Sequence, residues 1–130
     1  MKRVAVLMVV LLAACGGDMV TAPVDEAFTL RVGDVVSIDG TPLALKFVRV
    51  ESDTRCPYGA PCPSAPSGNA ATVFEAALSG ERATFTLNTA GVKDTTIGDY
   101  RVELAALNPV PTLAAQISSK EYRASVIVSR

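Results

Sequence analysis

The pattern of apolar and polar positions divides the chain into three parts. After Lys2 and Arg3, residues Val4 to Ala14 form one unbroken apolar run of eleven residues. Residues 16–27 are small and polar, contain a proline and show no periodicity, which is typical of a flexible tether. From Phe28 onward, short runs alternate apolar and polar residues with a period of two. Since period two indicates strands, residues 28–130 are predicted to form one β domain.

The alternating runs are short and are separated by turn residues. They cover residues 28–32, 35–38, 43–51, 72–78, 83–87, 94–97, 100–104 and 122–128. Asp39-Gly40 is a tight-turn dipeptide, and Pro109 and Pro111 stop the strand before them. The apolar phase changes face between Phe47 and Val48, which predicts a β-bulge or a strand that crosses between sheets. Seven or eight such strands predict a single antiparallel, immunoglobulin-like β-sandwich, with a small β-barrel as the alternative.

The apolar run ends in Leu12-Ala13-Ala14-Cys15. It is shorter than the ~20 residues of a membrane-spanning helix, and its basic head and small terminal residues are typical of a secretory signal. With cysteine at the processing point, this layout resembles the lipobox of bacterial lipoproteins. The resemblance implies a signal peptide over 1–14, acylation of Cys15 and a tether over 15–27. The alternative is a buried N-terminal strand or helix.

The chain without residues 1–14 is a usual size for one domain. It has 116 residues and a net charge of −3, with no run of like charge, so nothing predicts a nucleic-acid surface. The lipid implies a place in the cell envelope. Gly16 lacks the aspartate that marks inner-membrane retention in some bacteria, which favours the outer membrane, at its periplasmic face or the cell surface.

Lipidation of Cys15 would leave Cys56 and Cys62 as an even pair. In an exported, oxidising compartment the pair predicts a disulfide. It would close a loop of about seven residues and contribute ~2 kcal/mol on the chain-entropy model.

The residues around this pair carry a second resemblance. Asp53-Thr54-Arg55-Cys56-Pro57, Cys62 and Gly68-Asn69-Ala70 resemble a family of small, uncharacterised bacterial lipoproteins that carry Asp-Ser-Arg-Cys-Pro and a second cysteine. Thr54 stands where the family usually has serine, and the tryptophan usual after the second cysteine is absent. The resemblance implies a fold and no mechanism.

The loop over 52–69 is the candidate binding surface. In the functional interpretation, Tyr58 lies at its tip and Arg55, beside Asp53, contacts an anion. In the alternative, the staple merely holds a long crossover, with Arg55 paired to Asp53 or to a carbonyl or carboxylate across the domain.

No catalytic set stands out. The chain has no histidine, which excludes Ser-His-Asp sets and imidazole-based zinc sites. We therefore expect no catalytic residues, metal or cofactor, and a membrane-anchored lipoprotein with a non-catalytic binding or structural domain. Its partner would be an envelope protein, an envelope polymer or a small ligand. The alternatives are a carboxylate-dependent envelope hydrolase and an inhibitory module that uses the 52–69 loop as a wedge.

Overall fold

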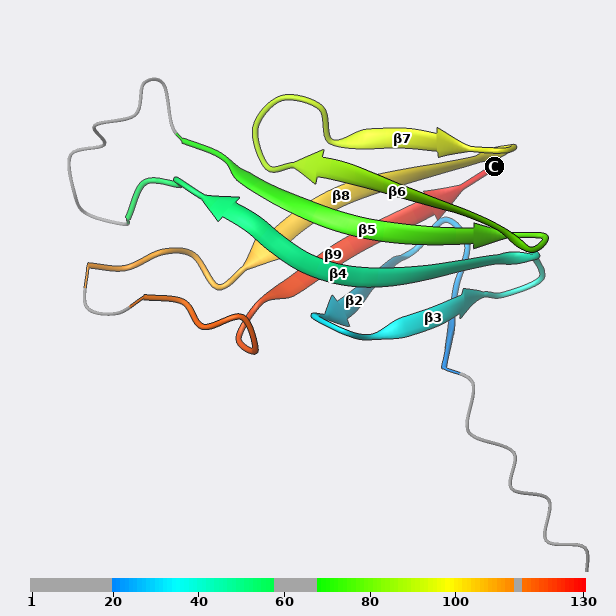
Figure 1. The fold of residues 1–130 in the computed structure, drawn as a ribbon, viewed down its shortest axis with the longest axis horizontal. Coiled ribbons are helices and arrows are strands. Elements are labelled where there is room, and N and C mark those ends of the chain that lie inside the picture. The colour runs from blue at the N-terminus through cyan, green and yellow to red at the C-terminus, as the bar shows by residue number, and fades with distance from the viewer. Residues whose placement is uncertain (1–19, 58–67, 114–115) are drawn as a thin grey trace, which may run out of the picture.

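The computed structural model describes residues 20–57, 68–113 and 116–130. In these residues the chain forms nine strands and no helix, arranged as two packed sheets (Figure 1). The strands are β1 (Thr21–Ala22), β2 (Ala27–Arg31), β3 (Val35–Ile38), β4 (Leu43–Asp53), β5 (Ala70–Leu78), β6 (Glu81–Asn88), β7 (Asp94–Ile97), β8 (Tyr100–Asn108) and β9 (Arg123–Ser129). The predicted β-sandwich is confirmed, and the sheets do not close into a barrel. The described part of the chain holds no helix with the length and hydropathy to cross a membrane.

The two sheets are built mainly from two meanders. One sheet has the order β1-β3-β4-β5-β6 and the other β2-β9-β8-β7. β1 runs parallel to β3, and all other strand pairs are antiparallel. Immunoglobulin domains connect their strands in a Greek key, so this domain shares their two-sheet architecture but not their connections.

The core lies between the sheets and follows the period-two pattern. On β4, the alternate residues Leu43, Leu45 and Phe47 are fully buried. Phe47 stacks on Phe74 of β5, with ring centroids 5.0 Å apart. Because full burial of such a side chain contributes about 1.5–3 kcal/mol, this alternation is sufficient to fix the face of each strand.

Both strands that lead to the candidate site are irregular. The predicted change of face on β4 is confirmed as a register shift between Phe47 and Arg49, and a second shift follows between Val50 and Ser52. β8 has its own shift between Leu104 and Ala106. Bulges bend a strand and redirect its side chains, so the ends of β4 and β8 can approach each other across the sandwich.

The domain begins earlier than predicted. The prediction of a flexible tether up to residue 27 is wrong for residues 20–27, because β1 pairs with β3 and Ala22 is buried. The backbone N–H of Asp25 donates to the Val128 carbonyl at 2.8 Å, and that of Asp39 to the Ala22 carbonyl at 2.8 Å. Cys15, the predicted signal and residues 15–19 of the predicted tether lie outside the described residues.

Candidate functional site

Asp53 and Arg55 form the centre of the site at one end of the sandwich. Asp53 closes β4, and Arg55 follows two residues later. The Arg55 Nε donates to Asp53 Oδ1 at 2.9 Å and its Nη2 to Oδ2 at 2.8 Å. Each side chain is only 12% exposed. This is a bidentate guanidinium–carboxylate pair, the strongest geometry such a pair can adopt.

The same guanidinium reaches the opposite sheet. Its Nη1 donates to the carbonyl of Leu107 at 2.7 Å, and its Nη2 to that of Pro109 at 2.9 Å. Leu107 lies on β8, whereas Asp53 lies on β4, so Arg55 ties the two sheets together at this end. A guanidinium carries five N–H donors, and the contacts with Asp53, Leu107 and Pro109 use four of them.

Tyr122 completes the cluster from the chain's last quarter. It stands just before β9, is buried, and its hydroxyl donates to Asp53 Oδ2 at 2.9 Å. Burial raises the pKa of Tyr122 to about 12, together with its hydrogen bond to Asp53. The phenol therefore stays protonated and donating at neutral pH. We call these three residues the Asp53–Arg55–Tyr122 cluster.

The Asp53 carboxylate is held in its ionised form. Burial alone would raise its pKa, but the hydrogen bonds from the side chain and backbone of Arg55 and from Tyr122, with the charge of Arg55, outweigh burial and lower the pKa below its usual 3.8. A carboxylate with a lowered pKa and three donor groups is a poor proton donor or acceptor at neutral pH. Asp53 is therefore suited to holding structure rather than to acid–base chemistry.

A second clamp joins the two ends of the loop. Thr54 Oγ1 donates to the Asn69 carbonyl and accepts from the Asn69 N–H, both at 3.0 Å. The Asn69 side chain continues to β6, donating to Asn88 Oδ1 at 2.8 Å. A serine hydroxyl at this position could make the same two contacts.

Gly68 is required by the same clamp. Its φ of +66° lies in the left-handed region, and a Cβ placed there would be 1.9 Å from the carbonyl oxygen of Thr54. The oxygen is backbone and cannot swing aside. The Asp-Thr-Arg and Gly-Asn parts of the motif thus have structural roles at the ends of the loop.

Two open hollows flank Arg55 and Pro111. The first has a volume of about 340 Å³ and is lined by Asp53, Arg55, Pro57, Pro111, Gln116, Ile117 and Tyr122. The second, of about 350 Å³, is lined by Arg55, Cys56, Gly68, Thr89, Ala90, Val110 and Pro111. Asp53 is the one acid in these described linings, and the rest mixes prolyl and apolar residues with polar ones such as Arg55, Gln116 and Thr89. Val110 and, nearby in sequence, Leu113 are exposed large hydrophobic residues.

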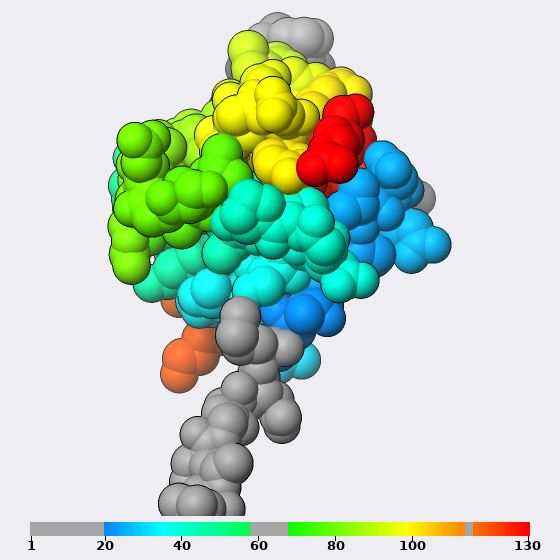
Figure 2. Space-filling view, turned by 90° about the vertical axis from the view of Figure 1, so that its right-hand side faces the viewer, coloured from blue at the N-terminus to red at the C-terminus, as the bar shows by residue number. Residues whose placement is uncertain are grey.

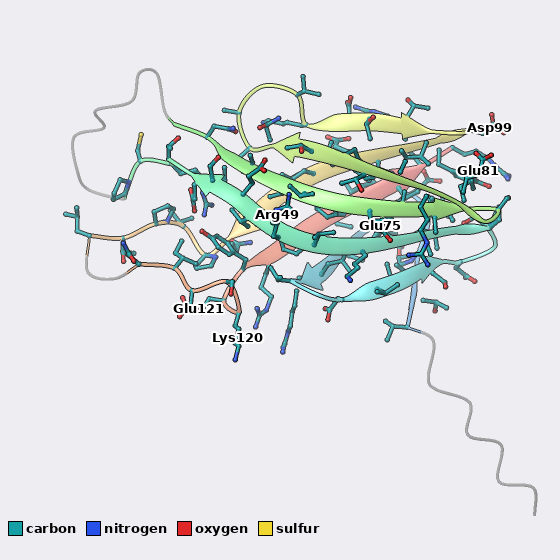
Figure 3. The ribbon with its side chains drawn as sticks, in the orientation of Figure 1. Arg49, Glu75, Glu81, Asp99, Lys120 and Glu121 are labelled. Carbon is teal, nitrogen blue, oxygen red and sulfur yellow. The ribbon has the colours of Figure 1, made fainter. Side chains whose placement is uncertain are left out.

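The two charged residues that directly precede Tyr122 in the chain do not line the first hollow. Lys120 and Glu121, just before Tyr122, are exposed and point outward at this end of the molecule (Figure 3). In the described ranges, no group of three or more His, Cys, Asp or Glu side chains is placed to hold a metal ion.

The predicted site residues are only partly brought together. Asp53 and Arg55 meet, but as an internal pair, so Arg55 is not the exposed anion contact of the functional interpretation. Both alternatives considered for it, a pair with Asp53 and a reach to carbonyls across the domain, occur at once. Tyr58 and Cys62 lie outside the described residues. Cys56 lines the second hollow, and its pairing with Cys62 stays a prediction.

Tyr122 and Asn69 are the functional positions that pattern reasoning did not single out. Tyr122 opens the alternating run over 122–128, which shows only the face that it takes, and its partner lies 69 positions away. Asn69 lies in the Gly68-Asn69-Ala70 part of the motif, and membership of this motif was the one sequence feature that could have pointed to it. Comparison with known proteins finds no matching family model, no matching curated sequence and no matching solved structure.

Proposed function

We propose that this chain is a lipid-anchored envelope protein whose β-sandwich is a non-catalytic recognition module. Its recognition surface is the loop end, defined by the two hollows together with Val110 and Leu113. One observation carries the proposal: the one acid among the described lining residues is engaged by Arg55 and Tyr122, while Val110, which lines the second hollow, and Leu113 are exposed apolar side chains. Exposed apolar patches on rigid scaffolds are typical of interaction sites.

The position of the loop end supports this role. β1 packs beside Ser37 and Ile38, next to the turn that precedes β4. β4 then runs from Leu43 to Asp53, a distance of ~33 Å at ~3.3 Å per residue. Figure 1 shows the loop end on the side opposite that turn. An anchor at Cys15 would therefore hold the other end of the sandwich near the membrane and present the loop end outward.

A short tether would limit how far the domain can move and rotate away from this orientation. Because packing already includes residue 20, the chain between Cys15 and Val20 can span at most ~18 Å. The tether predicted up to residue 27 would have allowed roughly 40 Å. A partner would then have to approach the domain within a narrow layer above the lipid.

The hydrolase alternative has weaker support. Such an enzyme needs at least two converging carboxylates, one with a raised pKa. The first hollow offers one carboxylate, and its pKa is lowered.

Site-specific cross-linking in intact cells tests the recognition surface. A photoreactive residue at Leu113 should give an adduct, either a discrete band for a protein or a ladder for an envelope polymer. The matched control is Asp39, which is exposed in the turn at the opposite end. No adduct from Leu113, or the same adduct from Asp39, would contradict the proposal.

A further inference from the structure

Among the strands of the described residues, β6 is the one long edge strand. It is the outermost strand of its sheet and has eight residues, whereas the other three edges, β1, β2 and β7, have two, five and four. Its register with β5 is continuous from Glu81 to Asn88, with no bulge, and it contains no proline or glycine. Natural sandwiches usually protect such an edge, because its free backbone groups can pair with another strand.

The turn before β6 decides which backbone groups face outward. Ser79 and Gly80 both have positive φ, 50° and 86°, and join β5 to β6 as a two-residue hairpin turn. In such a hairpin the flanking residues, here Leu78 and Glu81, form a hydrogen-bonded pair, and hydrogen-bonded pairs then alternate along the ladder.

Because of this alternation, one set of β6 residues directs its backbone N–H and C=O groups away from β5. Arg82, Thr84 and Thr86 direct their N–H and C=O groups outward, and all three are exposed. The next residue in the series, Asn88, agrees with this phase, since its N–H donates to the Val92 carbonyl rather than to β5.

We propose that this edge pairs with β6 of a second copy of the chain, antiparallel, about a two-fold axis at Thr84. In this register Thr84 lies opposite Thr84 of the second copy, and Arg82 opposite its Thr86. All three outward residues then find outward partners, which gives about six hydrogen bonds. Threonine pairs across strands are favourable, and no like charges face each other.

The neighbouring registers are poorer. A shift that centres the axis on Ala83 takes Thr86 out of the β6–β6 pairing. A shift to Phe85 places Arg82 opposite Asn88, whose N–H already donates to the Val92 carbonyl, and a shift to Arg82 places two guanidinium groups directly opposite. Like charges in that position destabilise a strand pair. The sequence of β6 therefore fits its own copy best in a single register.

A hollow beside the edge gives the second copy a side-chain contact. It has a volume of about 330 Å³ and is lined by Ala76, Leu78, Glu81, Arg82, Ala83, Thr96, Ile97 and Gly98. The β5–β6 and β7–β8 turns that bound it lie side by side (Figure 2). In the proposed register Phe85 of the second copy faces Ala83, so an aromatic ring lies at the rim of an apolar opening.

Disulfide trapping in the full, membrane-associated chain tests the register. With Thr84→Cys, the two Cα atoms would be about 5.5 Å apart, within the range for a disulfide. With Thr86→Cys, the two sulfurs would be separated by four strand positions, ~13 Å, which is too far. Mild oxidation should therefore give a dimer on a non-reducing gel for Thr84→Cys, at least tenfold more than for Thr86→Cys or the unsubstituted chain.

A mixture provides the positive control for folding and exposure. Arg82→Cys and Thr86→Cys should each stay monomeric alone and should cross-link when co-expressed. Equal dimer yields from Thr84→Cys and Thr86→Cys, or none from either Thr84→Cys or the mixture, would overturn the proposal. A cross-linked product of another mass would show that the edge takes a different chain and would also overturn it. None of these outcomes depends on the loop end.

Discussion

At the scale of single residues, the Asp53–Arg55–Tyr122 cluster explains a motif without invoking catalysis. The Asp53 carboxylate links the end of β4 to Tyr122, near the far end of the chain. Arg55 adds contacts with two carbonyls at the end of β8, those of Leu107 and Pro109. Removing one partner of a buried charge costs more than the pair's net contribution, because the remaining charge stays desolvated. The stability of the loop end should therefore be sensitive to each of the three side chains.

Tyr122→Phe isolates the phenol. We expect it to lower the free energy of unfolding by about 1–3 kcal/mol at pH 7, since it removes a hydrogen bond to an ionised group. Urea denaturation measures the change. Tyr100→Phe is the matched control, because Tyr100 is also buried but its hydroxyl only accepts, at 3.2 Å, from Arg130. An equal loss from both variants would show that the cluster has no special weight.

The loss of unfolding free energy caused by Tyr122→Phe should depend on pH in a definite direction. The pKa of Asp53 is lower in the folded chain than its ordinary 3.8, so its contribution is present above that value and is lost as pH falls through the folded pKa. Hydrogen bonds to a charged acceptor are about twice as strong as neutral ones. The deficit of Tyr122→Phe should therefore shrink as pH falls below 3.8, to about half once Asp53 is protonated, and a deficit that grew on acidification would contradict the assignment.

At the scale of elements, the strands were predictable and their junctions were not. The period-two alternation of apolar residues predicted β2 to β9, and the phase change at Phe47 predicted the bulge. Both worked because a strand with one buried face has apolar residues at alternate positions. β1 has two residues, too few to show a period. The contact between Asp53 and Tyr122 joins positions that no local pattern relates, and Asn69 shows its role only once β4, β5 and β6 are side by side.

Gly68→Ala tests the clamp at the ends of β4 and β5. The left-handed φ costs alanine about 1–2 kcal/mol, and the clash with the Thr54 carbonyl adds about 1–3 kcal/mol. Gly40→Ala is the control, since Gly40 has nearly the same φ, +69°, but open space around its Cβ position. Thermal unfolding should show the larger loss for Gly68→Ala, and similar losses would mean that the loop relaxes away from the clash.

At the scale of the whole molecule, the two proposed contact surfaces and the proposed lipid anchor are related through the sandwich. The β6 edge ends at Asn88, which accepts from the Asn69 side chain, and the next residues, Thr89 and Ala90, line the second hollow, so the two proposed surfaces adjoin at this end. If Cys15 is lipidated as proposed, the anchor would raise the local concentration of copies at the membrane and so favour weak pairing through β6.

The anchor itself rests on Cys15 and is tested by its removal. Cys15→Ser eliminates the thiol that the lipid would modify. We expect the exported variant to move from the membrane to the soluble fraction on cell fractionation. Cys56→Ser is the matched control and should stay with the membrane, because Cys56 belongs to the loop end. If Cys15→Ser remained membrane-bound after a high-salt wash, the lipid anchor and the orientation derived from it would both fail, while the β6 pairing would still stand on its own test.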